Sequence, residues 1–231
     1  GDAITTGNNN IAIGIDAMSA NTVGDRNTAV GHYALTNYNP SSNEDSLLSA
    51  FGYAALNANT TGAYNTGLGA YTLTANTTAQ HNTAIGYYAM AVNTTGGENV
   101  AVGNFALDAS NSTGNTALGR SALTALTTGS YNVAVGRYAL SSQTTASDNV
   151  AIGHLALAAN TTGTDNIAVG ANALDANISA SDNTAIGDNA LGANTTGNDN
   201  AALGSSALVT NTTGTENTAV GAYALYTNNG D

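Results

Sequence analysis

Residues 149–165 read NVAIGHLALAANTTGTD, and close copies of this stretch fill the chain. The copies align on the glycine at their fifth position, and their consensus is N-[TV]-A-[VI]-G-x-x-A-L-x-x-N-T-T-G-x-x. The aligned glycines recur every 17 residues, except for one interval of 21 and one of 16. They are Gly14, Gly31, Gly52, Gly69, Gly86, Gly103, Gly119, Gly136, Gly153, Gly170, Gly187, Gly204 and Gly221. A fixed short period of this kind is the signature of a repeat architecture.

Each copy is too short for a pair of helices and combines alternating β-branched residues with a Gly bend and an Asn-Thr-Thr-Gly turn. We therefore expect two short strands and two corners per copy, which together form one coil of an all-β, parallel β-solenoid. About thirteen coils spaced about 4.8 Å apart would make a rod roughly 60 Å long. The sequence predicts one repeat domain over residues 1–231, with a loop insertion at residues 38–45 in the 21-residue coil.

Asparagine stands four residues before twelve of the thirteen aligned glycines, and Leu48 replaces it once. Identical residues stack in a solenoid, so we predict an internal ladder whose side-chain amides hydrogen bond from coil to coil. Its members are Asn10, Asn27, Asn65, Asn82, Asn99, Asn115, Asn132, Asn149, Asn166, Asn183, Asn200 and Asn217.

The strand motif leaves two arrangements open. Side chains alternate across a strand, so the Asn and Ala of each motif share one face, and β-branched pairs such as Val133 and Val135 share the other. If the interior holds Ala and the later Leu, the Val/Ile column lies outside; if the interior holds Val and Ile, the Ala face is exposed. The first arrangement exposes more apolar surface than a soluble monomer carries. We therefore predict that this column is buried between subunits, and a homotrimer is a compact way to do so.

The motifs Asn82-Thr-Ala-Ile-Gly86, Asn149-Val-Ala-Ile-Gly153 and Asn217-Thr-Ala-Val-Gly221 resemble the head repeats of trimeric autotransporter adhesins. The longer unit that ends in Asn-Thr-Thr-Gly is similar to repeats of phage and viral tail-fibre proteins. This resemblance covers essentially the whole chain. It implies a left-handed parallel β-roll, three chains around one axis, and a role in attaching a cell or a virion to a surface.

Charge and composition exclude several classes of partner. The chain has three Arg and no Lys against fifteen Asp plus Glu, a net charge of −12, so the basic surface of a nucleic-acid binder or of a protein attracted to anionic lipid is missing. Without cysteine it has neither a disulfide framework nor a thiolate metal site. No apolar stretch approaches the roughly 18–20 residues that span a bilayer, so we expect no membrane insertion by this segment.

The sequence offers columns of like residues, whereas catalysis needs an asymmetric group of different residues. His32, His81 and His154 are spread along the chain and predict no shared site, so we expect no enzyme, no catalytic residue and no cofactor site. The metal candidates are acidic residues at one corner of five consecutive coils. Stacked carboxylates repel, and weakly bound Ca²⁺ would relieve that repulsion; the alternative is a solvated turn that favours solubility. These residues are Asp148, Asp165, Asp182, Asp199 and Glu216, with Glu98 in the same position earlier.

Two further columns have two interpretations each. Eight Asn-x-Ser/Thr sequons recur in the turn, at Asn59, Asn76, Asn93, Asn111, Asn160, Asn177, Asn194 and Asn211. They are glycosylation candidates in a secreted protein, or turn residues that tolerate left-handed φ. Aromatic residues stand two positions after the glycine, at Tyr33, Tyr71, Tyr88, Phe105, Tyr138 and Tyr223. Such a stripe either binds sugars and protein surfaces or packs against neighbouring coils or a second subunit.

We expect a non-enzymatic structural and adhesive repeat protein outside the cell, on a cell surface or on a virion. Its partners would be itself, as a homotrimer or filament, and a host-cell surface, matrix protein or glycan. The alternative is a subunit of an extracellular filament or coat that stacks end to end. An ice- or glycan-binding solenoid is a third hypothesis, prompted by threonine columns such as Thr161, Thr195 and Thr212.

Overall fold

The computed structural model describes residues 3–42 and 45–227. Its regular elements in that part of the chain are thirteen strands of three residues each. They are β1 (Ile11–Ile13), β2 (Thr28–Val30), β3 (Ser49–Phe51), β4 (Thr66–Leu68), β5 (Thr83–Ile85), β6 (Val100–Val102), β7 (Thr116–Leu118), β8 (Val133–Val135), β9 (Val150–Ile152), β10 (Ile167–Val169), β11 (Thr184–Ile186), β12 (Ala201–Leu203) and β13 (Thr218–Val220). One strand occurs per repeat, so the all-β parallel solenoid with a 17-residue repeat is confirmed.

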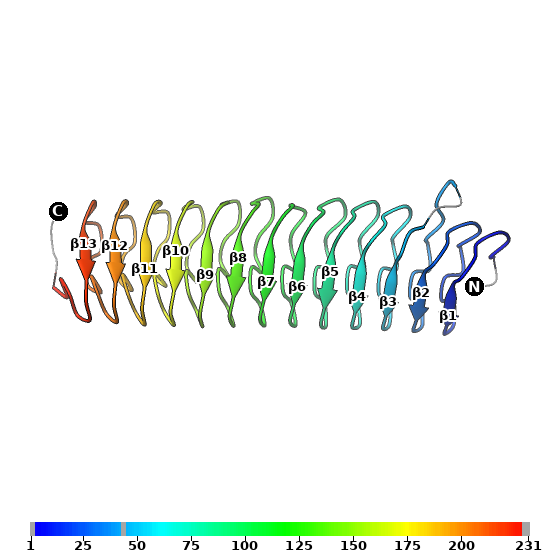
Figure 1. Ribbon diagram of the computed structural model, residues 1–231, viewed down its shortest axis with the longest axis horizontal. Helices are drawn as coiled ribbons and strands as arrows, with labels where there is room; N and C mark the ends of the chain where they lie inside the picture. Colours follow the sequence, from blue (N-terminus) through cyan, green and yellow to red (C-terminus); the bar gives the residue numbers. More distant parts are fainter. Residues whose placement is uncertain (1–2, 43–44, 228–231) are drawn as a thin grey trace. The chain divides into compact units, whose positions relative to one another are not determined.

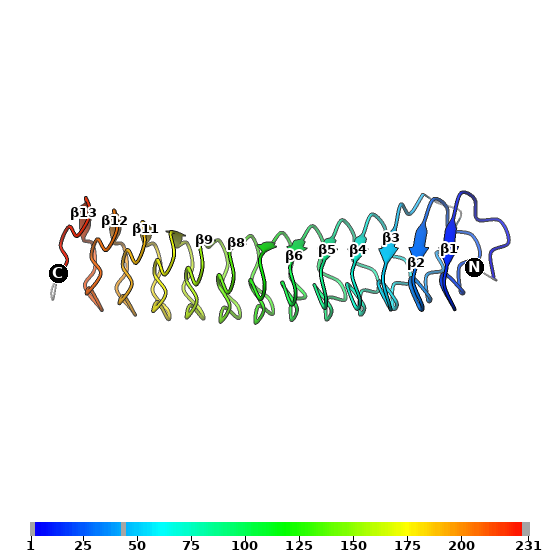
Figure 2. The same ribbon diagram turned by 90° about the horizontal axis from the view of Figure 1, so that it is seen from below.

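The chain forms two compact units, residues 1–114 with β1–β6 (unit 1) and residues 115–231 with β7–β13 (unit 2). Within each unit, consecutive strands pair in parallel and in sequence order, as Figure 1 shows. The register advances by one repeat per strand, so that Ala151, Ala168 and Ala185 are partners in β9, β10 and β11. Figure 2 shows the strands along one side of the coils and the turns along the other. The single domain over residues 1–231 stays a prediction.

The coil differs from the sequence expectation in having one strand instead of two. In the coil of β9, the second and fourth residues after Gly153 adopt left-handed backbone, with φ of 59° at Leu155 and 50° at Leu157. Strand residues need a strongly negative φ, so this alternation excludes a second strand. A left-handed L-residue costs about 1–2 kcal/mol. Full burial of the Leu157 side chain and its N–H···O bond to Ala173, at 3.0 Å, offset that cost.

The apolar core of each unit is thin and consists mainly of alanine, leucine and methionine. In the coil of β9 the apolar interior side chains include Ala151, Ala156 and Leu157, all fully buried, while Val150 and Ile152 point outward. The first of the two arrangements considered for the strand motif is therefore the one observed. The β-branched residues form the outer surface, and the alanines leave room for the interior leucines.

The aligned glycines are required by both conformation and packing. Their φ values lie between 122° and 141°, a region that L side chains rarely adopt. A Cβ atom on Gly170 would also lie 2.3 Å from the carbonyl oxygen of Gly187 in the next coil. This glycine column therefore allows successive coils to approach within strand-pairing distance.

The 21-residue coil contains the insertion predicted at residues 38–45, of which 43–44 lie outside the described residues. Tyr38 does not project into solvent as Asn39, Ser41 and Ser42 do. Its side chain is buried, and its hydroxyl shares a hydrogen bond with Ser46. It occupies the interior position seven residues after Gly31, which asparagine holds in most other coils, so the exposed part of the insertion begins after it.

Candidate functional site: the outer strand face and its flanking corners

The residue before each aligned glycine points outward from its strand and is apolar in every coil. We call this set the outer apolar column. It is Ile13, Val30, Phe51, Leu68, Ile85 and Val102 in unit 1, and Leu118, Val135, Ile152, Val169, Ile186, Leu203 and Val220 in unit 2. Leu68 is 47% exposed and Leu203 is 48% exposed. Single apolar residues scattered over a surface are common, whereas apolar residues at the same position of every coil form a continuous patch within each unit. Such a patch marks an interaction surface.

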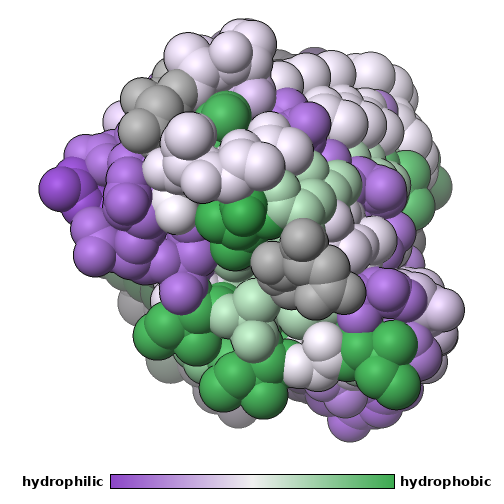
Figure 3. Space-filling view, turned by 90° about the vertical axis from the view of Figure 1, so that its right-hand side faces the viewer, coloured by the Kyte–Doolittle hydropathy of each residue, from purple (hydrophilic) through white to green (hydrophobic). Residues whose placement is uncertain are grey.

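The other outward position of each strand, three residues before the glycine, carries Thr, Ser, Val, Ile or Ala. The outward strand face is therefore uncharged in both units, although the chain has a net charge of −12. Apolar side chains also reach the surface at the first coil, where Ile11, Ile13 and Ile15 are exposed. Figure 3 looks onto that end of unit 1 and shows apolar groups beside polar ones.

A corner precedes each strand, at the residue five before the aligned glycine, and we call it the leading corner. Its residues are left-handed, with φ of 60° at Asp148 and 59° at Asp165. Its members are Asn9, Arg26, Leu47, Tyr64, His81, Glu98 and Gly114 in unit 1, and Tyr131, Asp148, Asp165, Asp182, Asp199 and Glu216 in unit 2. The five predicted metal candidates thus all stand on exposed leading corners of unit 2. The described residues contain no group of three or more His, Cys, Asp or Glu placed to hold a metal ion.

A second corner follows each strand, at the first and second residues after the aligned glycine, and we call it the trailing corner. In unit 1 it is aromatic. Tyr53 and Tyr71 have ring centroids 5.1 Å apart, and Tyr87 and Phe105 have centroids 5.6 Å apart. Desolvation beside these rings raises the pKa of Tyr71, and Tyr53 adds to the rise. The rings therefore pack against neighbouring coils while Tyr53 and Tyr87 stay exposed.

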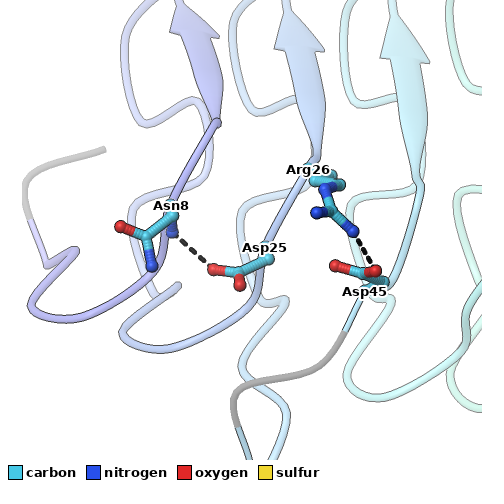
Figure 4. Close-up of polar contacts among 4 residues, drawn as sticks. All are labelled: Asn8, Asp25, Arg26 and Asp45. Atoms are coloured by element: carbon cyan, nitrogen blue, oxygen red, sulfur yellow. Dashed lines mark hydrogen bonds and ion pairs between the residues drawn. The ribbon is translucent and has the colours of Figure 1, made fainter.

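The trailing corner of unit 2 begins with a pair of arginines. The guanidinium carbons of Arg120 and Arg137 lie 5.8 and 4.8 Å from the ring centroid of Tyr138. A hydrogen bond from Arg137 and the charge of Arg120 lower the pKa of the Tyr138 phenol. In the part of the chain that the structure describes, neither arginine has an acidic partner. The ion pair found there joins Arg26 to Asp45 in unit 1 (Figure 4).

The close-up also places two polar contacts on successive coils of unit 1. The backbone N–H of Asn8 donates to a carboxylate oxygen of Asp25, and Arg26 pairs with Asp45 one coil further on (Figure 4). All four residues lie at the leading side of the coils, before the strands. These contacts join neighbouring coils and leave no obvious ligand position.

The predicted asparagine positions form hydrogen-bonded ladders inside the coils. Asn166 is representative: its Oδ1 accepts the backbone N–H of Asn183 at 3.1 Å, and its Nδ2 donates to the carbonyl oxygen of Ala180 at 2.8 Å. The same contact persists where the sequence departs from the pattern, because the N–H of Leu48 donates to Asn27 Oδ1 at 3.0 Å. In equivalent bonds, the Oδ1 of the asparagine one coil earlier accepts from the backbone N–H of Asn82, Asn99, Asn132, Asn149, Asn183, Asn200 and Asn217.

Seven of the eight sequon asparagines, the glycosylation candidates, are interior residues of the folded protein. Asn160 is representative: it is fully buried, and its Nδ2 donates to the carbonyl oxygen of Gly163 at 2.9 Å. An attached sugar would need that nitrogen in solvent. The seven are Asn59, Asn76, Asn93, Asn160, Asn177, Asn194 and Asn211. Asn111 is exposed, because the 16-residue coil shifts it one position further from its glycine.

The sequence does contain a signal for this burial. The position seven residues after the glycine also holds Tyr38, Leu126 and Gln143 in other coils. Large apolar residues that alternate with amides at one position indicate an interior site, and all three are buried. Buried asparagine here forms a second polar ladder, parallel to the first.

The histidines and threonines have structural contacts. His81 stacks on Tyr64 with ring centroids 4.8 Å apart, and His32 stacks on Tyr33 at 3.9 Å. The Thr161 hydroxyl donates to the carbonyl oxygen of Ile178 in the next coil at 2.9 Å. Those turn hydroxyls therefore bind the neighbouring coil instead of presenting a regular array to water.

The described coils contain no pocket, so their outer faces are the surfaces available for binding. None of their segments is a helix of the length and hydropathy that crossing a bilayer requires. No family model, no curated protein and no solved structure matches the chain.

Proposed function

We propose that the protein is a non-enzymatic extracellular structural and adhesive protein, the head or shaft of a trimeric adhesin or tail fibre. The observation that carries the proposal is the outer apolar column, which runs through every coil of both units on an uncharged strand face. Such a face needs a cover in water. In the proposed homotrimer, the columns of three chains cover one another.

The energy of that cover is of the right size for association. Complete burial of an aliphatic side chain contributes about 1.5–3 kcal/mol, so covering one that is already half buried contributes about 1 kcal/mol. The seven column residues of unit 2 would therefore contribute about 7 kcal/mol per chain. The entropic cost of association is about 4–15 kcal/mol. Burial of the outer apolar column therefore offsets a large part of this cost, and contacts made by the residues beside the column must offset the rest.

The adhesive part of the proposal is supported by repetition. Each coil presents the same backbone with different exposed side chains at its corners, such as Tyr53, Tyr87 and Arg137. A stiff repeated surface in three copies binds multivalently, so weak individual contacts with a host-cell surface, matrix protein or glycan add up. The resemblance of the Asn-x-Ala-x-Gly repeats to adhesin heads and tail fibres supports the same role.

The test is the mass of the chain in solution by multi-angle light scattering. We expect a discrete species of three times 22.8 kDa, about 68 kDa. The double variant Val135→Lys and Ile152→Lys, which adds charge to the outer apolar column, should become a monomer with an unchanged β-type circular dichroism spectrum. Thr128→Lys, which adds one charge at an exposed turn residue, is the control and should stay trimeric.

Two other results would overturn the trimer. A folded wild-type monomer of 22.8 kDa would show that the outer apolar column needs no cover. Polymers of micrometre length, seen by electron microscopy, would support the filament or coat subunit instead.

A further inference from the structure

We infer that copies of this chain associate in parallel and in register, with the leading corner of each coil against the trailing corner of the same coil in the next copy. The inference rests on the proposed trimer and says which side chains meet in it. In the coil of β9, the leading corner Asp148 stands two residues before the strand and the trailing corner His154 two residues after it. The corners therefore flank the strand face that carries the outer apolar column.

Symmetry fixes which corners meet. Rotation about an axis parallel to the coil stack brings one edge of each strand face against the opposite edge of the neighbouring copy, at the same level. An antiparallel pair instead brings leading corners against leading corners, in reversed order. Where unit 2 of one copy faces unit 2 of the other, that arrangement would set Asp165 against Asp165 and Asp148 against Asp182. Opposed like charges destabilise such a contact, so the acidic corners favour the parallel arrangement.

In the coils of β3–β5 of unit 1, both corners are uncharged and most of their residues are aromatic. Residues 46–97 contain no Asp, Glu, Lys or Arg. At the level of β4 the leading corner is Tyr64, 46% exposed, and the trailing corner includes Tyr71. At the level of β5 they are His81 and Tyr87. Parallel copies in register therefore place ring against ring at consecutive levels, an arrangement that aromatic side chains favour.

In unit 2, the corners of the β8 and β9 coils complement each other. At the level of β9 the trailing corner is His154 and the leading corner is Asp148. At the level of β8 they are Arg137 and Tyr131, and Tyr131 is 65% exposed. In a parallel neighbour, Asp148 lies one coil, about 4.8 Å, from the level of Arg137, within reach of that long side chain. Arg137 has no acidic partner among the described residues of its own chain.

The complementarity covers the coils of β3–β5 and of β8–β9. In the coil of β11 both corners are acidic, Asp182 and Asp188, and give no attraction there. The contact therefore has its aromatic part at the β4 and β5 levels of unit 1 and its charged part between the β8 and β9 levels of unit 2. The register follows from the rotation axis, which keeps equal levels of the copies together.

Disulfide trapping tests the contact, because the chain has no native cysteine. The variant with Leu47→Cys and Tyr53→Cys carries one thiol on each corner of the β3 coil. Strand β3 separates them by about 13 Å within one chain, too far for an intrachain bond. We expect covalent trimers on a non-reducing gel after mild oxidation. Leu47→Cys alone should give no dimer, whereas efficient dimers would show that leading corners meet and would overturn the inference.

Exchange of charges is the second test. Arg137→Asp and Asp148→Arg, each alone, should weaken trimer formation about fivefold or more, and the two together should restore it. Arg at position 148 suits the backbone, because Arg26 occupies the equivalent corner with φ of 56°. A trimeric wild type with neither trapped trimers nor restoration would overturn this inference and leave the proposed function standing. A monomeric wild type would instead overturn the proposed trimer itself.

Discussion

The interior asparagines join the coils at the residue scale, and Asn166 shows how much depends on one side chain. Its Oδ1 accepts hydrogen bonds from both the backbone N–H and Nδ2 of Asn183. Asn166→Ala would leave the backbone N–H of Asn183 without its acceptor, whereas Asn183 Nδ2 still donates to Ser181 O and the Ala180 carbonyl still accepts from Asn177 Nδ2. One unsatisfied buried group costs about 1–3 kcal/mol, so we expect a loss of about 2 kcal/mol. Urea denaturation measures it, with exposed Ser205→Ala as a control that should stay within about 0.5 kcal/mol.

The aligned glycines give a matched pair of substitutions. Gly170→Ala places a Cβ atom 2.3 Å from Gly187 O, whereas a Cβ atom on Gly221 meets nothing within 4 Å. Both glycines have positive φ, 141° and 122°, so both variants carry backbone strain. We expect Gly221→Ala to cost about 1 kcal/mol and Gly170→Ala several times more, because only the second forces neighbouring coils apart. Equal losses in denaturation would show that conformation alone requires these glycines.

Asp175 gives a prediction about pH. Burial raises the pKa of its carboxyl above the usual 3.8, although backbone N–H donors partly offset the rise. A raised folded-state pKa means that the native chain holds the proton more tightly than the unfolded chain. The resulting stability is present below the unfolded pKa and is lost as pH rises through the folded pKa. Asp175→Asn should therefore melt slightly higher than wild type at pH 7, with the difference vanishing near pH 3, as thermal melts followed by circular dichroism would show.

The sequence predicts the first asparagine ladder because twelve copies occupy one position beside strand residues of known alternation. Within a single repeat, nothing distinguishes the second asparagine column from turn residues, because Asn160 and Asn177 stand in Asn-Thr-Thr-Gly and similar strings that are typical of exposed bends. Only comparison between coils indicates burial, through the apolar residues Tyr38 and Leu126 at the same position.

At the element scale, the coil is the unit of folding and can be removed whole. Deletion of residues 149–165 joins Asp148 to Asn166 and keeps every column of unit 2 in register. We expect this variant to fold, because nearest-neighbour contacts between coils supply most of the stability of a solenoid. Deletion of residues 149–156 removes half a coil and should abolish cooperative unfolding. Circular dichroism melts compare the two, and a folded half-coil deletion would contradict this account of the coil.

The strand in each coil is predictable, and the segment after it is not. Alternating residues such as Val133-Ala134-Val135 predict a strand with alanine on one face. The segment from Leu155 to Leu157 looks equally apolar, but its second and fourth residues after the glycine are left-handed. Leucine seldom adopts this conformation, so no propensity indicates it. The contact that stabilises it, the N–H of Leu157 on Ala173 O, comes from the next coil.

At the scale of the whole molecule, net charge opposes assembly and uncharged faces favour it. Each copy carries a formal charge of −12, and repulsion between copies is strong at about 10 mM salt, where the Debye length is about 30 Å. The opposing contribution of exposed ion pairs such as that inferred for Arg137 and Asp148 is about 0–1 kcal/mol each. Burial of the outer apolar column depends little on salt. We therefore expect trimer formation to tighten as sodium chloride rises from about 10 to about 150 mM, measured by sedimentation velocity. Loosening over that range would show that ion pairs, and not the outer apolar column, dominate the contact.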